Sequence, residues 1–183
     1  NKGKFKEISY LLSKKIIKFS PRKLKIKSPK ETGKTFEENS ELKAYYFSKF
    51  IKFPVISDDS GLCIKALGGK PGIYSARWAK KHGSFDKAMK FILKKMEKKL
   101  NRSATFVCSL SLKYPKKKII TVVGKIKGTI SFKILGSRGF GYDPIFIPNS
   151  KSITFAQMPK IKKIKIDHRH VAFKKIKKKI KIF

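Results

Sequence analysis

The sequence predicts a mixed α/β fold in which helices pack on one long β-sheet. Two observations predict it. Helical and strand-like patterns alternate over the first half of the chain, and three strand-like runs follow one another in the middle. Alternation is typical of strands covered by helices, and successive strands separated by turn residues indicate an antiparallel meander. At 183 residues the chain is long enough for a full core, and we expect residues 1–183 to form a single domain.

The first half predicts two helices, because apolar side chains recur there at helical spacing. Pro54 ends the second of them, and short apolar runs on either side of the acidic pair Asp58-Asp59 predict two strands. The predicted elements are a helix at 2–13, a strand at 16–19, a basic connection at 21–29, a helix at 35–51, strands at 55–57 and 62–67, and a tight loop at 68–72.

The second half predicts a helix at each end of a strand-rich region. Ser84 is a plausible N-cap for the first helix, and a glycine-rich loop separates the meander from a further short strand. The predicted elements are a helix at 84–99, strands at 105–112, 118–126 and 129–135, a loop at 136–144, a strand at 145–147 and a helix from 168.

The composition is strongly basic, with 47 Lys and Arg against 11 Asp and Glu and a net charge of +36. Such a charge attracts polyanions, whether nucleic acid, anionic lipid or nucleoside triphosphates. The lysines are spread over nearly every segment, whereas a nucleic-acid module more often gathers them on one face. We therefore expect contact with nucleic acid only non-specifically, through charge.

Membrane and secreted classes are not indicated. No run of 18 apolar residues occurs, and no leader with a small-residue cleavage site precedes the first helix. Cys63 and Cys108 have no metal-ligand spacing and indicate buried, reduced thiols. We expect a cytoplasmic protein that has no contact with a membrane.

Negative charge is concentrated in one region, because six of the 11 acidic residues lie between positions 31 and 59. Glu31, Glu38 and Asp59 could converge on one Mg²⁺, which prefers oxygen ligands and takes one or two carboxylates plus substrate phosphates. The alternative is that these acids are helix N-terminal charges or partners of lysines, and we prefer it for Glu37 and Glu41. For Asp59, which follows a predicted strand, we prefer a functional role.

Three further segments are candidates for binding a ligand. Residues 1–4 precede a helix, whose N-terminus suits phosphate, although a cap with lysines is also common. The loop 139–143 brings glycines, aromatic rings and Asp143 together; a flat ligand or an ordinary turn would each explain it. His168-Arg169 opens the last helix and supplies a planar donor group.

Together these motifs resemble one family, the inosine triphosphate pyrophosphatases, also described as dITP/XTP pyrophosphatases. The resemblance covers nearly the whole chain in the family's order. It is carried by the segments 1–7, 31–33, 36–39, 42–44, 58–62, 67–77, 139–146 and 168–169.

The resemblance implies a hydrolase acting on acid anhydrides, which converts ITP, dITP or XTP to the monophosphate and pyrophosphate with Mg²⁺. Asp59 would be the catalytic carboxylate, and Glu31 and Asp59 would hold the metal. The remaining implied site residues bind substrate. Those near the triphosphate are Asn1, Lys4, Lys43 and Ser60; those at the base and sugar are Phe140, Gly141, Tyr142, Asp143, Lys163, His168 and Arg169.

The resemblance also implies an elongated mixed sheet flanked by helices, two lobes with the active site in the cleft between them, and a homodimer. The strand that precedes Asn1 in the family is absent from this sequence. The competing hypothesis is a basic nucleic-acid-binding protein without hydrolase activity, supported by the net charge and the basic tail 174–181. That hypothesis does not explain the acidic cluster, which would repel a phosphate backbone. A third hypothesis is a related pyrophosphatase acting on other modified nucleotides.

Overall fold

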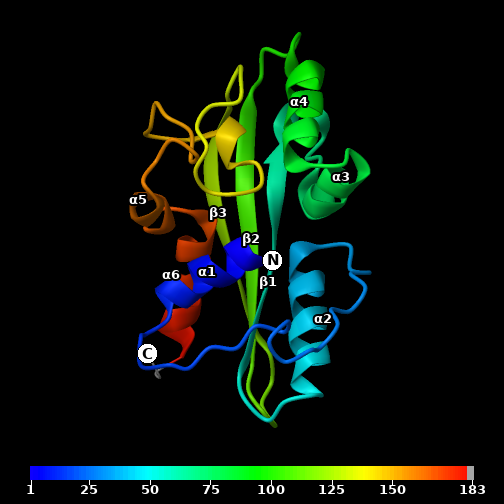
Figure 1. The fold of residues 1–183 in the computed structure, drawn as a ribbon, viewed down its shortest axis with the longest axis vertical. Coiled ribbons are helices and arrows are strands. Elements are labelled where there is room, and N and C mark those ends of the chain that lie inside the picture. Colours follow the sequence, from blue (N-terminus) through cyan, green and yellow to red (C-terminus); the bar gives the residue numbers. More distant parts are fainter. Residues whose placement is uncertain (181–183) are drawn as a thin grey trace. The chain divides into compact units, whose positions relative to one another are not determined.

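The computed structural model describes residues 1–180, so Lys181 at the end of the basic tail lies outside the described residues. A four-stranded sheet has the order β1-β2-β3-β4 (Figure 1). The strands are β1 (Val55–Ile64), β2 (Ser103–Lys113), β3 (Ile120–Ile130) and β4 (Phe146–Pro148). β3 and β4 pair antiparallel, with Thr129 opposite Ile147. The predicted mixed α/β fold is therefore confirmed.

The chain divides into two compact units. The first contains Asn1–Asp59, Cys108–Gly124 and Arg169–Phe183, and the second contains Ser60–Val107 and Lys125–His168. Each unit has a hydrophobic core of its own, since the two clusters of buried apolar residues share no member.

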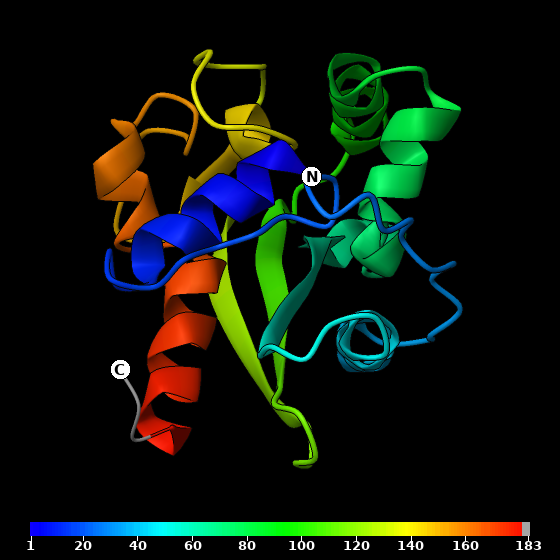
Figure 2. The same cartoon turned by 60° about the horizontal axis from the view of Figure 1, so that its bottom comes forward.

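In the first unit, helices cover both faces of the sheet. Successive residues of a strand point to opposite faces. The side chains of Cys108, Leu110 and Leu112 on β2 pack in one cluster with helix α6 (His168–Lys179). The intervening Ser109 and Ser111 hydrogen-bond to helix α2 (Phe36–Ser48). The two helices accordingly lie on opposite sides of the strands (Figure 2).

Helix α1 (Lys2–Leu11) also belongs to the first unit and lies beside α6 (Figure 2). Its Ile8 and Leu11 pack against the α6 cluster, where Ala172 and Ile176 are almost fully buried. The predicted apolar faces of the first and last helices are therefore confirmed, and the packing of α1 turns Lys4 and Glu7 toward the rest of this unit.

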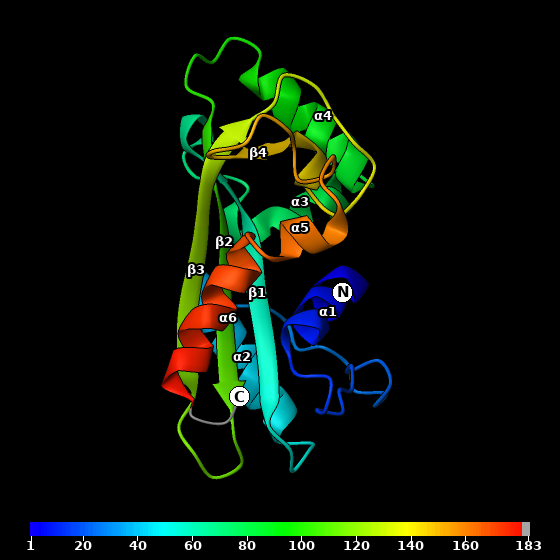
Figure 3. The ribbon, with the colours of Figure 1, turned by 90° about the vertical axis from the view of Figure 1, so that its left-hand side faces the viewer.

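The second unit carries helices α3 (Ser75–Lys81), α4 (Phe85–Met96) and α5 (Lys160–Ile164) (Figure 3). The predicted cap of α4 is confirmed, because Ser84 Oγ accepts a hydrogen bond from Lys87 N at 3.1 Å. Ile92 and Met96 on α4 are fully buried in the core of this unit with Phe146 and Phe155. This core supports the glycine-rich loop from beneath, through Tyr142 and Ile145.

Three predictions about strands were wrong. Residues 16–19 form no strand, since Ile17 is 80% exposed and has no sheet to pack on. The strands predicted at 55–57 and 62–67 form one strand, β1, so Asp59 lies within a strand and not at its end. The strand predicted at 129–135 continues β3 up to Ile130. Gly128, which falls between two of the predicted strands, lies inside β3. A Cβ there would be 2.2 Å from the carbonyl oxygen of Ile147, so the close approach of β4 requires a glycine.

Two short helices, α3 of 7 residues and α5 of 5 residues, were not predicted. Within residues 1–180, no helix has the length and apolar character needed to cross a membrane.

Candidate active site

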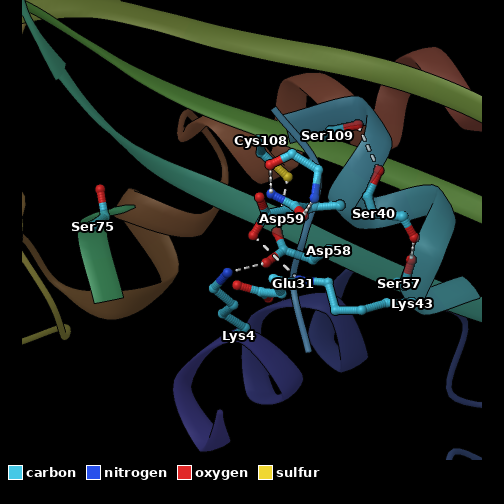
Figure 4. A network of polar contacts seen from close by, with 12 residues as sticks. Lys4, Glu31, Ser40, Lys43, Ser57, Asp58, Asp59, Ser75, Cys108 and Ser109 are labelled. Carbon is cyan, nitrogen blue, oxygen red and sulfur yellow. Dashed lines mark hydrogen bonds and ion pairs between the residues drawn. The ribbon is translucent and has the colours of Figure 1, made fainter. Parts of the chain in front are cut away.

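A buried group of hydroxyls fixes helix α2 against the sheet (Figure 4). Ser40 Oγ lies 2.8 Å from Ser109 Oγ and 2.7 Å from Ser111 Oγ, and the hydroxyl of Ser57 on β1 donates to the carbonyl oxygen of Ser40. A buried hydroxyl without a partner is costly, so sliding α2 along the sheet would be opposed at several bonds at once. Lys43 follows Ser40 by one helical turn and is held in register with β1.

Lys43 brings the two predicted metal-binding carboxylates together. Its Nζ lies 2.6 Å from Oε1 of Glu31 and 3.2 Å from Oδ1 of Asp59. The side chains of Lys43 and Asp59 are 13% and 7% exposed, so this contact is largely shielded from water. The structure therefore places Glu31, Lys43 and Asp59 in one cluster within the first unit.

The electrostatics of this cluster favour a further cation. Burial raises the pKa of Asp59, although the Lys43 ammonium opposes that shift. Burial would lower the pKa of Lys43, but Asp59 and Glu31 outweigh it and the pKa is raised. Two carboxylates thus share one ammonium, and the excess of negative charge can be offset by a metal ion.

The residues present fit Mg²⁺. Oδ2 of Asp59 is buried and has no hydrogen-bond partner within the described residues, which suits an oxygen that coordinates a metal. No group of three or more His, Cys, Asp or Glu side chains that could hold a metal occurs in the described part of the chain. Mg²⁺ needs no such group, since it takes one or two carboxylates and completes its shell with water and phosphate oxygens.

The loop that carries Glu31 is attached to α2 by a buried amide. Asn39 Oδ1 accepts from Gly33 N at 2.8 Å, and Asn39 Nδ2 donates to Gly33 O at 3.4 Å. Glu38 does not join the acidic cluster, because its Oε2 accepts from Lys34 N at 2.6 Å and it lies in the first turn of α2. The possibility of Glu38 as a third metal ligand is therefore not supported, and Glu38 acts at the helix N-terminus.

A second group of charges lies on α1, β1 and α6. Asp58 Oδ1 lies 2.6 Å from Lys4 Nζ, and Asp58 Oδ2 lies 3.3 Å from Arg169 Nε. Glu7 Oε2 accepts from Arg169 Nη1 at 2.8 Å. Burial would raise the pKa of Asp58, but Lys4, Arg169 and the thiol of Cys108 hold that pKa far below its usual range.

Arg169, which was expected at the base, lies among these side chains of the first unit. Its side chain is 3% exposed and its guanidinium is engaged by two carboxylates, Glu7 and Asp58. Asn1 caps α1, because its Oδ1 accepts from Lys4 N at 3.1 Å. The cap directs the first turn of α1 and with it the Lys4 side chain.

The second unit contains a buried ion pair under the glycine-rich loop. Oδ2 of Asp143 lies 2.6 Å from Lys163 Nζ and accepts from Phe140 N at 2.9 Å. The Lys163 ammonium also lies 4.9 Å from the centre of the Phe140 ring. Gly139 has a φ of +76°, and a Cβ there would lie 2.2 Å from Oδ2 of Asp143. The glycine therefore allows the loop to close on the carboxylate.

The other expected base-site residues differ in exposure. Tyr142 is 2% exposed, its hydroxyl donates to Ser75 O at 2.9 Å, and its ring belongs to the core of the second unit. His168 is also buried, with its ring stacked on Phe106 at 4.7 Å between centroids. Phe140, Gly141 and Ser60 are half-buried.

Three residues with a part in these clusters received no role from the sequence. Asp58, Glu7 and Asn39 are all buried polar groups whose partners lie far away along the chain or on another element. For Asp58, a signal was available in its position beside Asp59. For Glu7, the only signal was that it is an acid three residues after Lys4 in a strongly basic chain.

Comparison with known proteins identifies the family. The model of the Ham1 family matches residues 1–179. The chain belongs to the Ham1 family.

Known relatives align with almost the whole of this chain. A dITP/XTP pyrophosphatase of Rhodospirillum centenum is 40% identical over 180 residues, covering 96% of this chain and 89% of its own. A dITP/XTP pyrophosphatase of Oceanobacillus iheyensis is 42% identical over 183 residues, covering 97% and 93%. The predicted resemblance to this family is therefore confirmed.

Solved Ham1 structures have the same fold. The Ham1 protein of Staphylococcus aureus superposes with a TM-score of 0.87 at 35% identity, covering 99% of this chain and 94% of that chain. A HAM1 protein from Coxiella burnetii gives a TM-score of 0.86 at 33% identity, covering 97% and 93%. The predicted mixed α/β fold agrees with both.

Proposed function

We propose that this chain is a nucleoside triphosphate pyrophosphohydrolase that converts dITP, XTP or ITP to the monophosphate and pyrophosphate. The single observation that carries the proposal is the cluster of Glu31, Lys43 and Asp59. The cluster combines the buried Asp59 carboxylate, whose Oδ2 has no hydrogen-bond partner within the described residues, with the Lys43 ammonium. Relatives of this chain are named for the same activity.

Asp59 is the proposed catalytic carboxylate. Its buried carboxylate, which the Lys43 ammonium orients, is proposed to accept a proton from the attacking water. The water attacks the innermost phosphorus, the bond to the bridging oxygen breaks, and pyrophosphate leaves. The Lys43 ammonium donates to phosphate oxygens and stabilises the charge that develops on them.

Glu31 and Asp59 are the proposed ligands of Mg²⁺. Bound there, the ion would neutralise phosphate charge and hold the reacting group in line with the water. Lys4 contributes a further ammonium at 23% side-chain exposure, together with the N-terminus of α1 around Asn1. Ser60, which follows Asp59 on β1, is proposed to bind near the same phosphates.

The proposed contacts of the base and sugar are Phe140, Gly141, Tyr142, Asp143, Lys163, His168 and Arg169. The half-buried Phe140 ring offers a stacking surface, and the Lys163 ammonium offers donors suited to the 6-keto oxygen that adenine lacks. A site whose buried donors would be left unpaired can reject the wrong base by ~10⁴-fold or more. Tyr142 keeps the loop in place from the core.

The remaining expectations are part of the same proposal. We expect a cytoplasmic homodimer that contacts nucleic acid only through charge. Exposed apolar side chains such as Leu100 and Phe132, at 102% and 83% exposure, are surface that a second copy would cover. Light scattering of the purified protein tests the dimer.

The activity is tested by a panel of nucleotides with Mg²⁺. We expect pyrophosphate from dITP, XTP and ITP at rates at least ~100-fold above that from dATP, since adenine lacks the 6-keto oxygen that Lys163 is proposed to contact. Orthophosphate as the product, or equal hydrolysis of dATP, would contradict the proposal. Salt-sensitive DNA binding without hydrolysis would favour the competing nucleic-acid hypothesis.

A further inference from the structure

Four charged residues of the first unit are joined by three ion pairs, and helix α1, which carries both Lys4 and Glu7, closes them into a ring. Lys4 and Glu7 are three residues apart on α1 and therefore lie on one face of that helix. Lys4 pairs with Asp58, Asp58 pairs with Arg169, and Arg169 pairs with Glu7. The ring contains two positive and two negative charges, so it is neutral as a whole.

Asp58 is the member of the ring that joins α1 to the strand carrying Asp59. Both of its oxygens are engaged, Oδ1 by Lys4 at 2.6 Å and Oδ2 by Arg169 at 3.3 Å and by the Cys108 thiol at 3.0 Å. Its side chain is 4% exposed. Because both oxygens are held by side chains, any part that Asp58 plays in activity acts through its partners.

Lys4 is the member of the ring that reaches the surface. Its side chain is 23% exposed, whereas those of Asp58, Arg169 and Glu7 are 3–4% exposed. A lysine side chain has many rotamers, and fixing it costs about 1.5–2 kcal/mol of conformational entropy. The contact with Asp58 fixes the Lys4 ammonium before any substrate binds.

We propose that Asp58 is a positioning residue, which holds the Lys4 ammonium in the place where it binds the triphosphate. This inference rests on the proposed function. The ammonium has three donor hydrogens, so the one used by Asp58 leaves others for phosphate oxygens. Preorganisation of this kind increases affinity because the entropy is lost on folding and not on binding.

Two other roles for Asp58 would each give a different change in KM. If Asp58 only competed with phosphate for Lys4, removing its charge would release an ammonium and lower KM for the nucleotide. If Asp58 only stabilised the fold, removing it would lower the melting temperature and the amount of active enzyme, but would leave the KM of the folded fraction unchanged.

The test is a double-mutant cycle of Asp58→Asn and Lys4→Met, with pyrophosphate release from dITP and Mg²⁺ as the readout. We expect Asp58→Asn to raise KM about tenfold and to change kcat less than about threefold. The double variant should be no more than about twofold worse than Lys4→Met, since Asp58 has nothing to position once Lys4 is gone. Asp86→Asn, which removes the exposed carboxylate paired with Lys90, is the matched control and should leave KM unchanged.

Two results would overturn the inference: an unchanged or lowered KM in Asp58→Asn, or single effects that multiply in the double variant. Where Asp58→Asn does not fold, Asp58→Glu keeps the charge but displaces it, and we expect KM to rise about threefold.

Calorimetric titration with inorganic triphosphate separates this inference from the proposed function. We expect weaker binding to Asp58→Asn, or to Asp58→Glu where the former does not fold, than to the wild-type protein, even if dITP is not the substrate. Equal binding would contradict the positioning role of Asp58, whatever the substrate.

Discussion

The ammonium of Lys43 lies 3.2 Å from Oδ1 of Asp59, while Oδ2 of the same carboxylate has no hydrogen-bond partner within the described residues. One oxygen of Asp59 is thus oriented by a cation and the other remains available. Glu31, at 2.6 Å from the same ammonium, adds a second carboxylate. This geometry supports both the proposed metal and the proposed base.

Glu31→Gln tests the metal-binding part of the proposal. The substitution keeps the size of the side chain but removes a charge, so we expect the Mg²⁺ concentration for half-maximal activity to rise at least about tenfold. The measurement is pyrophosphate release from dITP over a Mg²⁺ titration. Glu37→Gln, on the exposed side of the first turn of α2, is the matched control. An unchanged Mg²⁺ dependence would exclude Glu31 as a ligand.

Lys163→Met tests the reading of the base. We expect kcat/KM for dITP to fall about 100-fold or more and that for dATP to change little, because only the 6-keto base loses a donor. Lys163→Met leaves the Asp143 carboxylate buried without its cation, which could destabilise the protein. The double variant Lys163→Met with Asp143→Asn is therefore measured alongside. Thermal unfolding shows whether each variant is folded. Parallel losses for both nucleotides would contradict a role in specificity.

Glu7→Gln tests the ion-pair ring as a source of stability. Arg169 keeps Asp58 but loses its contact with Glu7, and a buried guanidinium that loses one carboxylate should cost about 2–4 kcal/mol of unfolding free energy. Urea unfolding measures this difference. Glu97→Gln changes an exposed carboxylate and should alter the free energy by less than about 0.5 kcal/mol. Equal effects of the two substitutions would mean that the ring contributes no stability.

The thiol of Cys108 should be unreactive in the folded protein. Burial raises its pKa well above the ordinary value, and the neighbouring Asp58 carboxylate raises it further, so almost no thiolate is present at pH 8. Iodoacetamide should label the half-buried Cys63 slowly and Cys108 not at all, and should label both in urea. Rapid labelling of Cys108 in a Cys63→Ser variant of the native protein would contradict the described packing.

The helices were the part of the fold that the sequence predicted best. The apolar stripe of α4 and the cap at Ser84 depend on local spacing, and both are confirmed. Predictions of strand boundaries were wrong where the contact that determines the boundary involves a residue distant in the sequence. In the sequence Gly128 resembles a turn residue, and only its close contact with Ile147 shows that it belongs to a strand. Residues 16–19 contain apolar side chains but do not pack against a sheet.

In the candidate site, too, contacts between residues distant in the sequence were the ones that could not be predicted. Glu31 and Asp59 could be singled out from the concentration of acidic residues, and Lys43 from the family resemblance; the fold brings the three together. The connection of Glu7 to Arg169 spans 162 positions, and no local pattern predicts it. The resemblance assigned Arg169 to the base, and its contacts with Glu7 and Asp58 were not expected.

The most direct test of the central claim is the rate of pyrophosphate release from dITP by Asp59→Asn in the presence of Mg²⁺. The substitution preserves shape and removes the proposed base, so we predict a fall in kcat of about 10²–10⁴-fold with little change in melting temperature. A folded Asp59→Asn protein that keeps more than about a tenth of the wild-type kcat would contradict the account.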